Sequence, residues 1–436
     1  MKNKMTWDKL LNAGRLGKPD SGIGSTAERS GFHRDYDRIA FSHPFRRLND
    51  KTQVHPLSRN DHVHSRLTHS LEVSIVGRSL GMAVGKRMTG LPEGIGSPDL
   101  GQILQAACLM HDLGNPPFGH AGEDAIQSWF SDAKNTPFFE GLTPDQRLDF
   151  KTFEGNAQAF RLVANLEHNP GKGGMQLTYA TLAALMKYPW TSPHAGTKKK
   201  FCAFQSEKGP LQEVAEKTGL LLQSDGRYCR HPLAFLAEAA DDICYRMIDL
   251  EDAAEIGLLP FEMVLEVFEA VCNAKADSSL SQRNQLSYLR ARSINTAINA
   301  VAQVFIENES ALLEGEIPYN RGLISLCPAE IQVPLDAAQM LAQDRVYTDH
   351  RKMELQIGGY ALLGNLLELF CTALRERLAG ERVSYKCEQV MALMKFEAPK
   401  YGDALYPSLL KVTDYISGMT DQYASRMARQ LSGMGE

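Results

Sequence analysis

Residues 100–123, LGQILQAACLMHDLGNPPFGHAGE, indicate the fold of the surrounding chain most clearly. Their first half is apolar at i, i+3, i+4, i+7 and i+11, the spacing of one face of an α-helix: Leu100, Ile103, Leu104, Ala107 and His111. The stripe therefore runs into the ionisable pair His111-Asp112, just before a turn at Pro116-Pro117. This pattern predicts a helix whose buried face carries a histidine towards the interior.

Two other segments show the same pattern. The first stripe consists of His69, Val73, Val76, Leu80 and Ala83, and the second of Ala237, Ala240, Asp241, Cys244 and Ile248. A charge on a buried face is costly unless it is paired or binds a metal. A single histidine in such a place is more often a hydrogen-bonded core residue, but three faces with a metal-competent side chain favour a metal site.

Two imidazoles and two carboxylates would form a site of nitrogen and oxygen ligands without thiolate. Such a set suits Mn, Mg, Fe, Co, Ni or Zn, and the ligand types do not choose among them. A metal held this way can polarise a phosphoryl oxygen, lower the pKa of a bound water or hold the substrate.

The composition is that of a globular protein with a large core. The 436 residues include 47 Lys and Arg against 52 Asp and Glu, a formal net charge of -5, and 43% are hydrophobic. These values argue against a disordered, collagen-like or transmembrane chain. The negative charge gives no global attraction to nucleic acid or to an anionic membrane, so any polyanion must be met locally.

The chain carries no secretory pattern that we recognise. Its eight scattered cysteines form no Cys-x-x-Cys pair, which predicts reduced thiols in the core of a cytoplasmic protein. The best candidate for a membrane span, Gly358 to Leu374, contains Asn365 and Glu368 and is expected to be a buried helix. We therefore expect no membrane partner.

Helical periodicity predicts an all-α protein with two parts. Residues 1–260 are expected to form the core that carries the stripes, and residues 261–436 a C-terminal helical region packed on it. Prolines, glycines and the run Lys198-Lys199-Lys200 predict loops and a short hairpin inserted at about residues 188–232. Pro318 to Pro334 is a second irregular stretch that separates two helical groups.

Several segments resemble the bacterial deoxyguanosine triphosphate triphosphohydrolases, a family of HD-domain phosphohydrolases. The matching segments are FRRLNDKTQV (45–54), RLTHS (66–70), HDLGNPPFGHAGE (111–123), FEGNAQ (153–158), EAADDICY (238–245) and DYISGMTD (414–421). The resemblance implies an HD-domain helical core with one metal site, here expected to take Mn²⁺ or Mg²⁺. It also implies release of intact triphosphate from a deoxynucleoside triphosphate and assembly into ring-like homo-hexamers.

The family's metal ligands correspond to His69, His111, Asp112 and Asp241. The adjacent Asp242 is not chosen, because consecutive helical residues point about 100° apart and only Asp241 shares the apolar face. The resemblance further places Tyr245 and Asp249, at i+4 and i+8 from Asp241, against the deoxyribose. Asp242 is then an outer or capping carboxylate.

His120 and Glu123 are three residues apart at the expected start of a helix, so they face the same way. A carboxylate beside an imidazole orients the ring and raises its pKa, as general acid–base or nucleophilic work requires. Without the resemblance, a plain salt bridge is the simpler interpretation. With it, the two are the catalytic pair, acting at the α-phosphorus or on its attacking water.

Other matched positions are expected to bind substrate. The resemblance gives Arg66 and Asn156 as phosphate contacts, and position adds Lys187, Tyr188 and Lys200, although a lysine run is also typical of a solvated loop. Gln53 corresponds to a position near the sugar, where lack of room for a 2′-hydroxyl would select deoxynucleotides.

Nearby histidines have another interpretation. Those preceding His69, namely His55, His62 and His64, are interpreted as a polar loop in preference to a second metal cluster.

Three functions stay open at this stage. The first is a deoxynucleoside triphosphate triphosphohydrolase that prefers dGTP or acts more broadly. The second is an HD phosphohydrolase acting on nucleoside monophosphates or guanosine tetraphosphate, and the third is a non-catalytic nucleotide- or nucleic-acid-binding regulator. The set Gln53, Tyr245 and Asp249 favours the first, since a deoxyribose clamp has no evident use on an alarmone ribose. Single-stranded DNA is a candidate effector.

Overall fold

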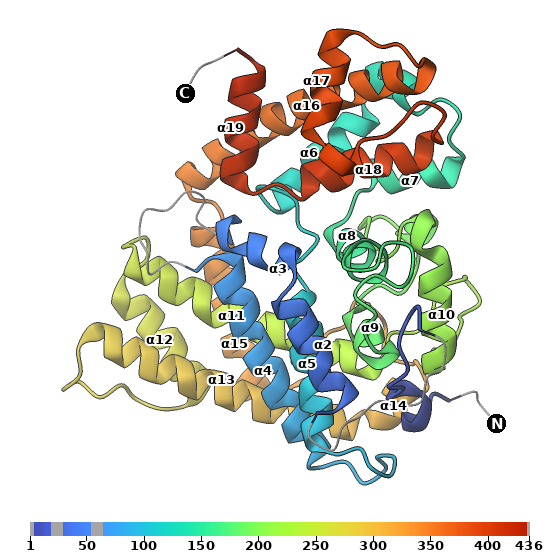
Figure 1. Ribbon diagram of the computed structural model, residues 1–436. Coiled ribbons are helices and arrows are strands. Elements are labelled where there is room, and N and C mark those ends of the chain that lie inside the picture. Colours follow the sequence, from blue (N-terminus) through green and yellow to red (C-terminus); the bar gives the residue numbers. More distant parts are fainter. Residues whose placement is uncertain (1–3, 19–28, 54–63, 434–436) are drawn as a thin grey trace.

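The computed structural model describes residues 4–18, 29–53 and 64–433. Within these ranges the chain is all-α, as predicted, with helices and four isolated β-bridges but no strand. Figure 1 shows two groups of helices, a larger lower one and a smaller upper one. Each group encloses its own hydrophobic cluster, called here the first and the second core.

The first core draws on both halves of the sequence. Its helices are α1 (Trp7–Leu10), α2 (Gly31–Ala40), α3 (His43–Arg47), η1 (Leu48–Asp50), α4 (Arg66–Gly85), α5 (Ser97–Met110), α9 (Tyr179–Leu185), α10 (Lys208–Thr218), α11 (Pro232–Glu255), α12 (Phe261–Cys272), α13 (Gln282–Glu307), α14 (Glu309–Leu313), η6 (Leu323–Leu326), α15 (Ala329–Leu341) and η7 (Ala342–Val346). The predicted boundary near residue 260 thus falls between α11 and α12, two helices of one core.

The second core joins a middle segment to the C-terminal end. It contains α6 (His120–Ser131), η2 (Ala133–Phe139), α7 (Pro144–Lys151), α16 (His350–Ala379), α17 (Tyr385–Leu393), η8 (Lys395–Glu397), α18 (Leu405–Ser417) and α19 (Asp421–Leu431). The remaining helices are α8 (Gly155–Arg161), η3 (Leu162–Leu166), η4 (Ser192–His194) and η5 (Gln205–Glu207). Helix α8 contributes to both cores, with Ala157 in the second and Phe160 in the first, whereas Val163 and Ala164 of η3 lie in the first core.

A row of glycines brings α4 and α5 almost into backbone contact. A Cβ added at Gly77 would lie 2.5 Å from Cys108 Sγ, one at Gly81 2.5 Å from Leu100 O, and one at Gly85 2.6 Å from Ser97 Cα. The order of these contacts shows that the two helices run antiparallel. The start of α4, which carries His69, is therefore opposite the end of α5, where His111 follows.

The insertion at residues 188–232 holds more helix than its composition indicates. Besides η4 and η5 it contains α10, whose buried Leu211, Val214, Ala215 and Thr218 follow helical spacing. The hairpin-like part is limited to a single antiparallel bridge between Leu222 and Tyr228.

The predicted buried helix at Gly358 to Leu374 lies within α16. By length and composition alone, Lys352–Ala379 is the one segment of the described chain apolar enough to cross a membrane, with 44% of its most apolar window buried inside the protein. Its fully buried Leu363, Leu367 and Phe370 pack into the second core. This pattern is that of an amphipathic helix with one face in the core.

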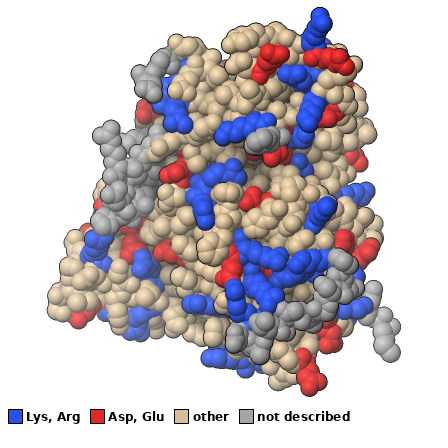
Figure 2. Space-filling model, in the orientation of Figure 1, with Lys and Arg blue, Asp and Glu red and all other residues tan. Residues whose placement is uncertain are grey.

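Two other predictions concern the cysteines and the surface charge. All eight cysteines are buried and unpaired, as predicted. The surface is less uniform than the net charge indicates: Figure 2 shows acidic and basic side chains interspersed, with basic ones gathered below the centre of the face drawn.

Candidate active site

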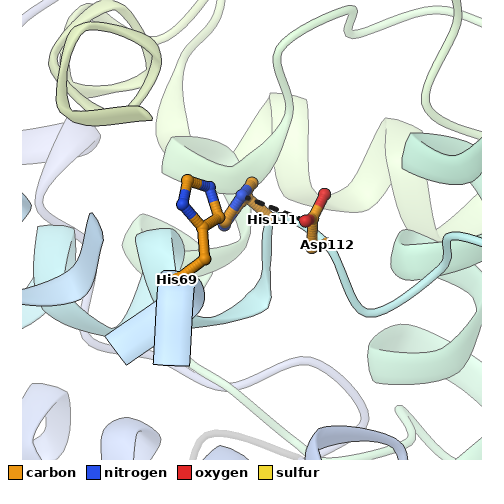
Figure 3. Close-up of side chains that lie close together, drawn as sticks. All are labelled: His69, His111 and Asp112. Carbon is orange, nitrogen blue, oxygen red and sulfur yellow. Dashed lines mark ion pairs between the residues drawn. The ribbon is translucent and has the colours of Figure 1, made fainter. Parts of the chain in front are cut away.

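Two histidines and an aspartate meet where α4 and α5 face each other. The ligand atoms of His69, His111 and Asp112 lie within 4.8 Å of one another, and Figure 3 shows the three side chains converging. The two imidazole rings are 5.4 Å apart between centroids. Helix α5 ends at Met110, so His111 and Asp112 project from the turn that follows it.

Helix α11 adds Asp241 to this group. Its Oδ1 lies 3.1 Å from His69 Nε2 and 3.6 Å from His111 Nε2. Asp242 makes no such contact with either histidine. Burial alone would raise the pKa of Asp241, but His111 and His69 outweigh it and hold that pKa below its usual range. Of the two adjacent aspartates, the structure therefore brings Asp241 to the histidines, which is the one that shares the apolar helix face.

The surroundings of the four side chains suit a metal. His111 Nδ1 contacts Cys108 O at 2.7 Å, and a proton on that nitrogen leaves Nε2 free to bind a cation. Asn115 Nδ2 donates to Asp112 Oδ1 at 2.5 Å, and Arg66 Nη1 donates to Asp112 Oδ2 at 2.6 Å. Despite burial, Arg66 lowers the pKa of Asp112 and keeps it ionised. The donor set of two imidazoles and two carboxylates fits a divalent ion that accepts nitrogen and oxygen ligands.

His120 and Glu123 form a hydrogen-bonded pair at the start of α6. His120 Nδ1 and Glu123 Oε2 are 2.9 Å apart, and the amide of Gly155 donates to Glu123 Oε1 at 2.7 Å. The carboxylate is therefore buried and held from two sides, while 83% of the His120 side-chain surface is accessible. The hydrogen bond to Glu123 raises the pKa of His120. An oriented and accessible imidazole can accept or deliver a proton.

A cavity of about 250 Å³ joins the metal-ligand group to this pair. Nine of the predicted site residues line it: His111, Asp112, His120, Glu123, Asn156, Lys187, Tyr188, Lys200 and Asp241. The cavity lies between the two cores, since α5 and α11 form one wall and α6 the other.

The lysines of the cavity are paired with carboxylates that the sequence did not single out. Lys200 Nζ donates to Glu154 Oε1 at 2.6 Å, and Lys187 Nζ lies 3.1 Å from Glu238 Oε1. Lys200 is thus no solvated loop lysine. Burial would lower its pKa, but Glu154 and Glu123 raise it, so the ammonium stays charged.

Asn156 shares one of these carboxylates. Its side-chain amide donates to Glu154 Oε1 at 2.9 Å, and its backbone amide to Oε2 at 2.7 Å. Glu154 is the N-cap of α8, a position the Phe-Glu-Gly-Asn segment could have indicated. Glu238 precedes Asp241 by three residues and so lies on the same side of α11, a spacing that could also have pointed to it.

Three predicted sugar contacts do not line the cavity. Tyr245 and Asp249 lie one and two turns beyond Asp241 on α11. Tyr347 donates to Asp249 Oδ2 at 2.6 Å, and burial raises the pKa of Asp249 to about 6. Gln53 is the last described residue before a gap, and its Oε1 is buried without a partner among the described residues. No sequence signal indicated Tyr347.

The predicted polar loop lies mostly outside the described residues, which omit His55 and His62. His64 is described and pairs with acids away from the metal-ligand group: its Nδ1 is 2.7 Å from Asp252 Oδ1 and its Nε2 is 3.2 Å from Glu72 Oε1.

Comparisons with known proteins give a consistent result. Residues 66–191 match the family model described as HD domain. A "Deoxyguanosinetriphosphate triphosphohydrolase-like protein" of Pseudomonas aeruginosa is 44% identical over 98% of this chain and 99% of its own length. A protein of the same name from Synechocystis sp. is 41% identical over 99% of this chain and all of its own. A "Deoxyguanosinetriphosphate triphosphohydrolase" of Cronobacter sakazakii is 32% identical over 99% of this chain and 98% of its own.

Proposed function

The chain belongs to the deoxyguanosinetriphosphate triphosphohydrolase family of HD-domain proteins, and on this premise we propose that it is a metal-dependent deoxynucleoside triphosphate triphosphohydrolase. It acts on dGTP by preference or on several dNTPs, and releases the deoxynucleoside and intact triphosphate. The composition of one cavity is the strongest support for this function. Metal-competent side chains line one wall of the cavity, and an oriented imidazole and two lysines line its other sides.

His69, His111, Asp112 and Asp241 would hold the ion, with Mn²⁺ or Mg²⁺ as our first candidates among the metals that accept such ligands. When bound, the ion polarises a phosphoryl oxygen as a Lewis acid. Arg66 and Asn115 hold the two oxygens of Asp112, so its carboxylate is oriented before any ion arrives.

His120 and Glu123 are proposed as the catalytic pair. Glu123, fixed by the Gly155 amide, holds the His120 ring by Nδ1 and leaves Nε2 to act. That nitrogen either attacks the α-phosphorus, displacing the 5′-oxygen of the deoxynucleoside, after which water hydrolyses the phosphorus–nitrogen bond to release triphosphate, or it takes the proton of a water that displaces the same oxygen directly.

Substrate binding is assigned to the remaining predicted residues. Lys187, Lys200, Asn156, Tyr188 and Arg66 would meet the phosphates, because a triphosphate needs several converging donors. Glu154 and Glu238 keep the two lysines charged and directed until the substrate binds.

Three further residues are assigned to the sugar. Tyr245, Asp249 and Gln53 would contact the deoxyribose.

Product analysis tests this proposal. The purified protein is incubated with each dNTP, GTP, dGMP and guanosine tetraphosphate, with Mn²⁺ or Mg²⁺, and the products are separated by ion-exchange chromatography. Deoxynucleoside with intact triphosphate would support the proposal, and relative rates would give the base preference. Turnover of monophosphate or guanosine tetraphosphate alone would replace it with the second function named above. No turnover, even with single-stranded DNA added, would favour a binding role.

Assembly and location follow from the family proposal. We propose a homo-hexamer in the cytoplasm, without a membrane partner and with single-stranded DNA as a candidate effector. The gathering of basic side chains in Figure 2 is a place where such a polyanion could bind despite the net negative charge. Native mass spectrometry and light scattering would measure the oligomeric state, with and without the DNA.

A further inference from the structure

One carboxylate near the C-terminus binds the loop that connects the metal-ligand group to His120. Asp421, the first residue of α19, is 2% exposed. Its Oδ1 accepts from the amide of Phe118 at 3.0 Å, and its Oδ2 accepts from the amide of Thr52 at 3.0 Å. Residues 414–421 form one of the segments behind the resemblance, yet the chemistry proposed above gives Asp421 no role.

A buried lysine joins the same segments. Lys51 is 4% exposed, and its Nζ donates to Asn115 O at 2.5 Å and to Ser417 O at 2.8 Å. The backbone oxygen of Lys51 also accepts from the amide of Arg66 at 3.2 Å, at the start of α4. The loop, the α18–α19 turn and the start of α4 are therefore tied together at one point.

The loop needs such ties because its backbone is strained at one end. Phe118 has φ 64° and Gly119 has φ 59°, directly before α6 begins at His120. The left-handed region is unfavourable for a phenylalanine, and such residues persist where the surrounding structure over-determines them. The two ties hold Asn115 O and Phe118 N, on either side of the turn at Pro116-Pro117.

We propose that Asp421 and Lys51 act as positioning residues, a clasp that fixes the loop from Asp112 to His120 and thereby sets His120 against the metal-ligand group. This inference rests on the proposed function for its kinetic consequence. Neither residue lines the cavity. Helices α18 and α19 belong, with α6, to the second core in the upper group of Figure 1, so the clasp also joins the second core to the first.

Loosening this clasp should affect the position of His120 more than the geometry of the metal-ligand group. His69 and Asp241 lie on helices of the first core, and His111 and Asp112 directly follow α5 of the same core, so their mutual geometry depends mainly on packing within that core. His120 stands at the far end of the loop, on a helix of the second core. Loosening the clasp displaces the imidazole while leaving the metal site intact, and misplacement by about 1 Å can cost about 100-fold in rate.

Two variants loosen the clasp with little change of volume. Asp421→Asn replaces one acceptor oxygen by a donor that must face a backbone N–H, and Lys51→Met removes the donor but keeps the apolar stem. Asp149→Asn is the matched control: Asp149 is a fully buried carboxylate of the second core that accepts from Ser192, Gln205 and Tyr406 and does not touch the loop.

Kinetics and hydrogen exchange decide the outcome. In both clasp variants kcat should fall by about 10- to 100-fold, with the Mn²⁺ dissociation constant and KM unchanged. Peptides covering residues 113–119 should exchange amide hydrogens faster. The double variant should be little worse than either single one, since both break one unit. The control should keep the native kcat and the native exchange of this loop.

Other results would overturn the proposal that the clasp positions His120. An equal fall of kcat in Asp149→Asn would show that general loosening of the second core is responsible, and a parallel loss of Mn²⁺ affinity in the clasp variants would show that the metal site depends on it. If the native protein cleaves no dNTP, the proposed function fails, and hydrogen exchange alone decides the clasp. Unchanged exchange at residues 113–119 would then contradict it, and faster exchange would support it.

Discussion

The two walls of the cavity are built in different ways. One wall is formed by α5 and α11, which pack with α4 within a single core, and α4 and α5 approach so closely that glycine is needed where they meet. On the other wall, His120 and Glu123 belong to α6, whose apolar face lies in the second core. The ligand geometry therefore depends on helix packing, whereas the alignment of His120 depends on a loop between two cores. Metal affinity and turnover should be separable by mutation.

Asp241→Ala should have the largest effect, because it removes a proposed metal ligand from the packed wall. We expect Mn²⁺ binding to be lost and turnover to fall by more than about 100-fold. Removing a residue that only orients a metal ligand usually lowers activity by about 10- to 100-fold. Calorimetric titration with Mn²⁺ and the product assay would measure both. Asp242→Asn is the control: burial, with Glu238 nearby, raises the pKa of Asp242 to about 7, so a neutral side chain there should leave metal binding intact.

His120→Ala should separate the two walls. Turnover should fall by about 10²- to 10⁴-fold, the usual worth of a positioned acid or base, while Mn²⁺ binds as in the native protein. Asp124→Asn, on the same helix but bonded to Tyr360, should change neither. Native turnover in His120→Ala would remove the catalytic assignment.

Gly81→Ala tests the packed wall through its backbone. The added Cβ would lie 2.5 Å from Leu100 O, and such overpacking costs about 1–3 kcal/mol of unfolding free energy. Because His69 lies on one of the two helices forced apart and His111 directly follows the other, Mn²⁺ affinity should fall too. Urea denaturation and metal titration would show this against Gly90→Ala, where nothing lies within 4 Å of the added Cβ.

The smallest effect concerns His64, which ties the segment before α4 to α11. Burial would lower its pKa, but hydrogen bonds to Asp252 and Glu72 outweigh it and raise the pKa to about 10. Since the folded pKa exceeds the unfolded one of about 6.5, the stabilisation is complete below pH 6.5 and is lost as pH rises towards 10. Urea denaturation should show His64→Gln to be most destabilising near pH 6 and almost neutral above pH 10. A loss that does not change with pH would contradict the pairing.

Much of the site could be predicted because helical periodicity is local. The three apolar stripes led to His69, His111 and Asp241, and the three-residue spacing showed that His120 and Glu123 face the same way. These inferences needed only the geometry of a single helix and the cost of burying a charge, whereas the catalytic interpretation of His120 and Glu123 also needed the family resemblance. The same reasoning separated Asp241 from Asp242.

The rest required contacts between distant segments. Glu154 and Glu238 came to light only as partners of Lys200 and Lys187, and Tyr347 only as the donor to Asp249. No spacing along the chain links these pairs, since which residue faces a given side chain depends on how whole helices pack.

The sequence by itself determined the helical character and the residues that share a helix face, because these follow from short-range backbone geometry. The tertiary structure decided that the glycines of α4 set the ligands of two helices opposite each other, and that the C-terminal helix α19 meets the loop before His120. Both result from the packing of side chains from remote parts of the chain into two cores. Such packing leaves no periodic pattern in the sequence, so it cannot be predicted from the spacing of residues.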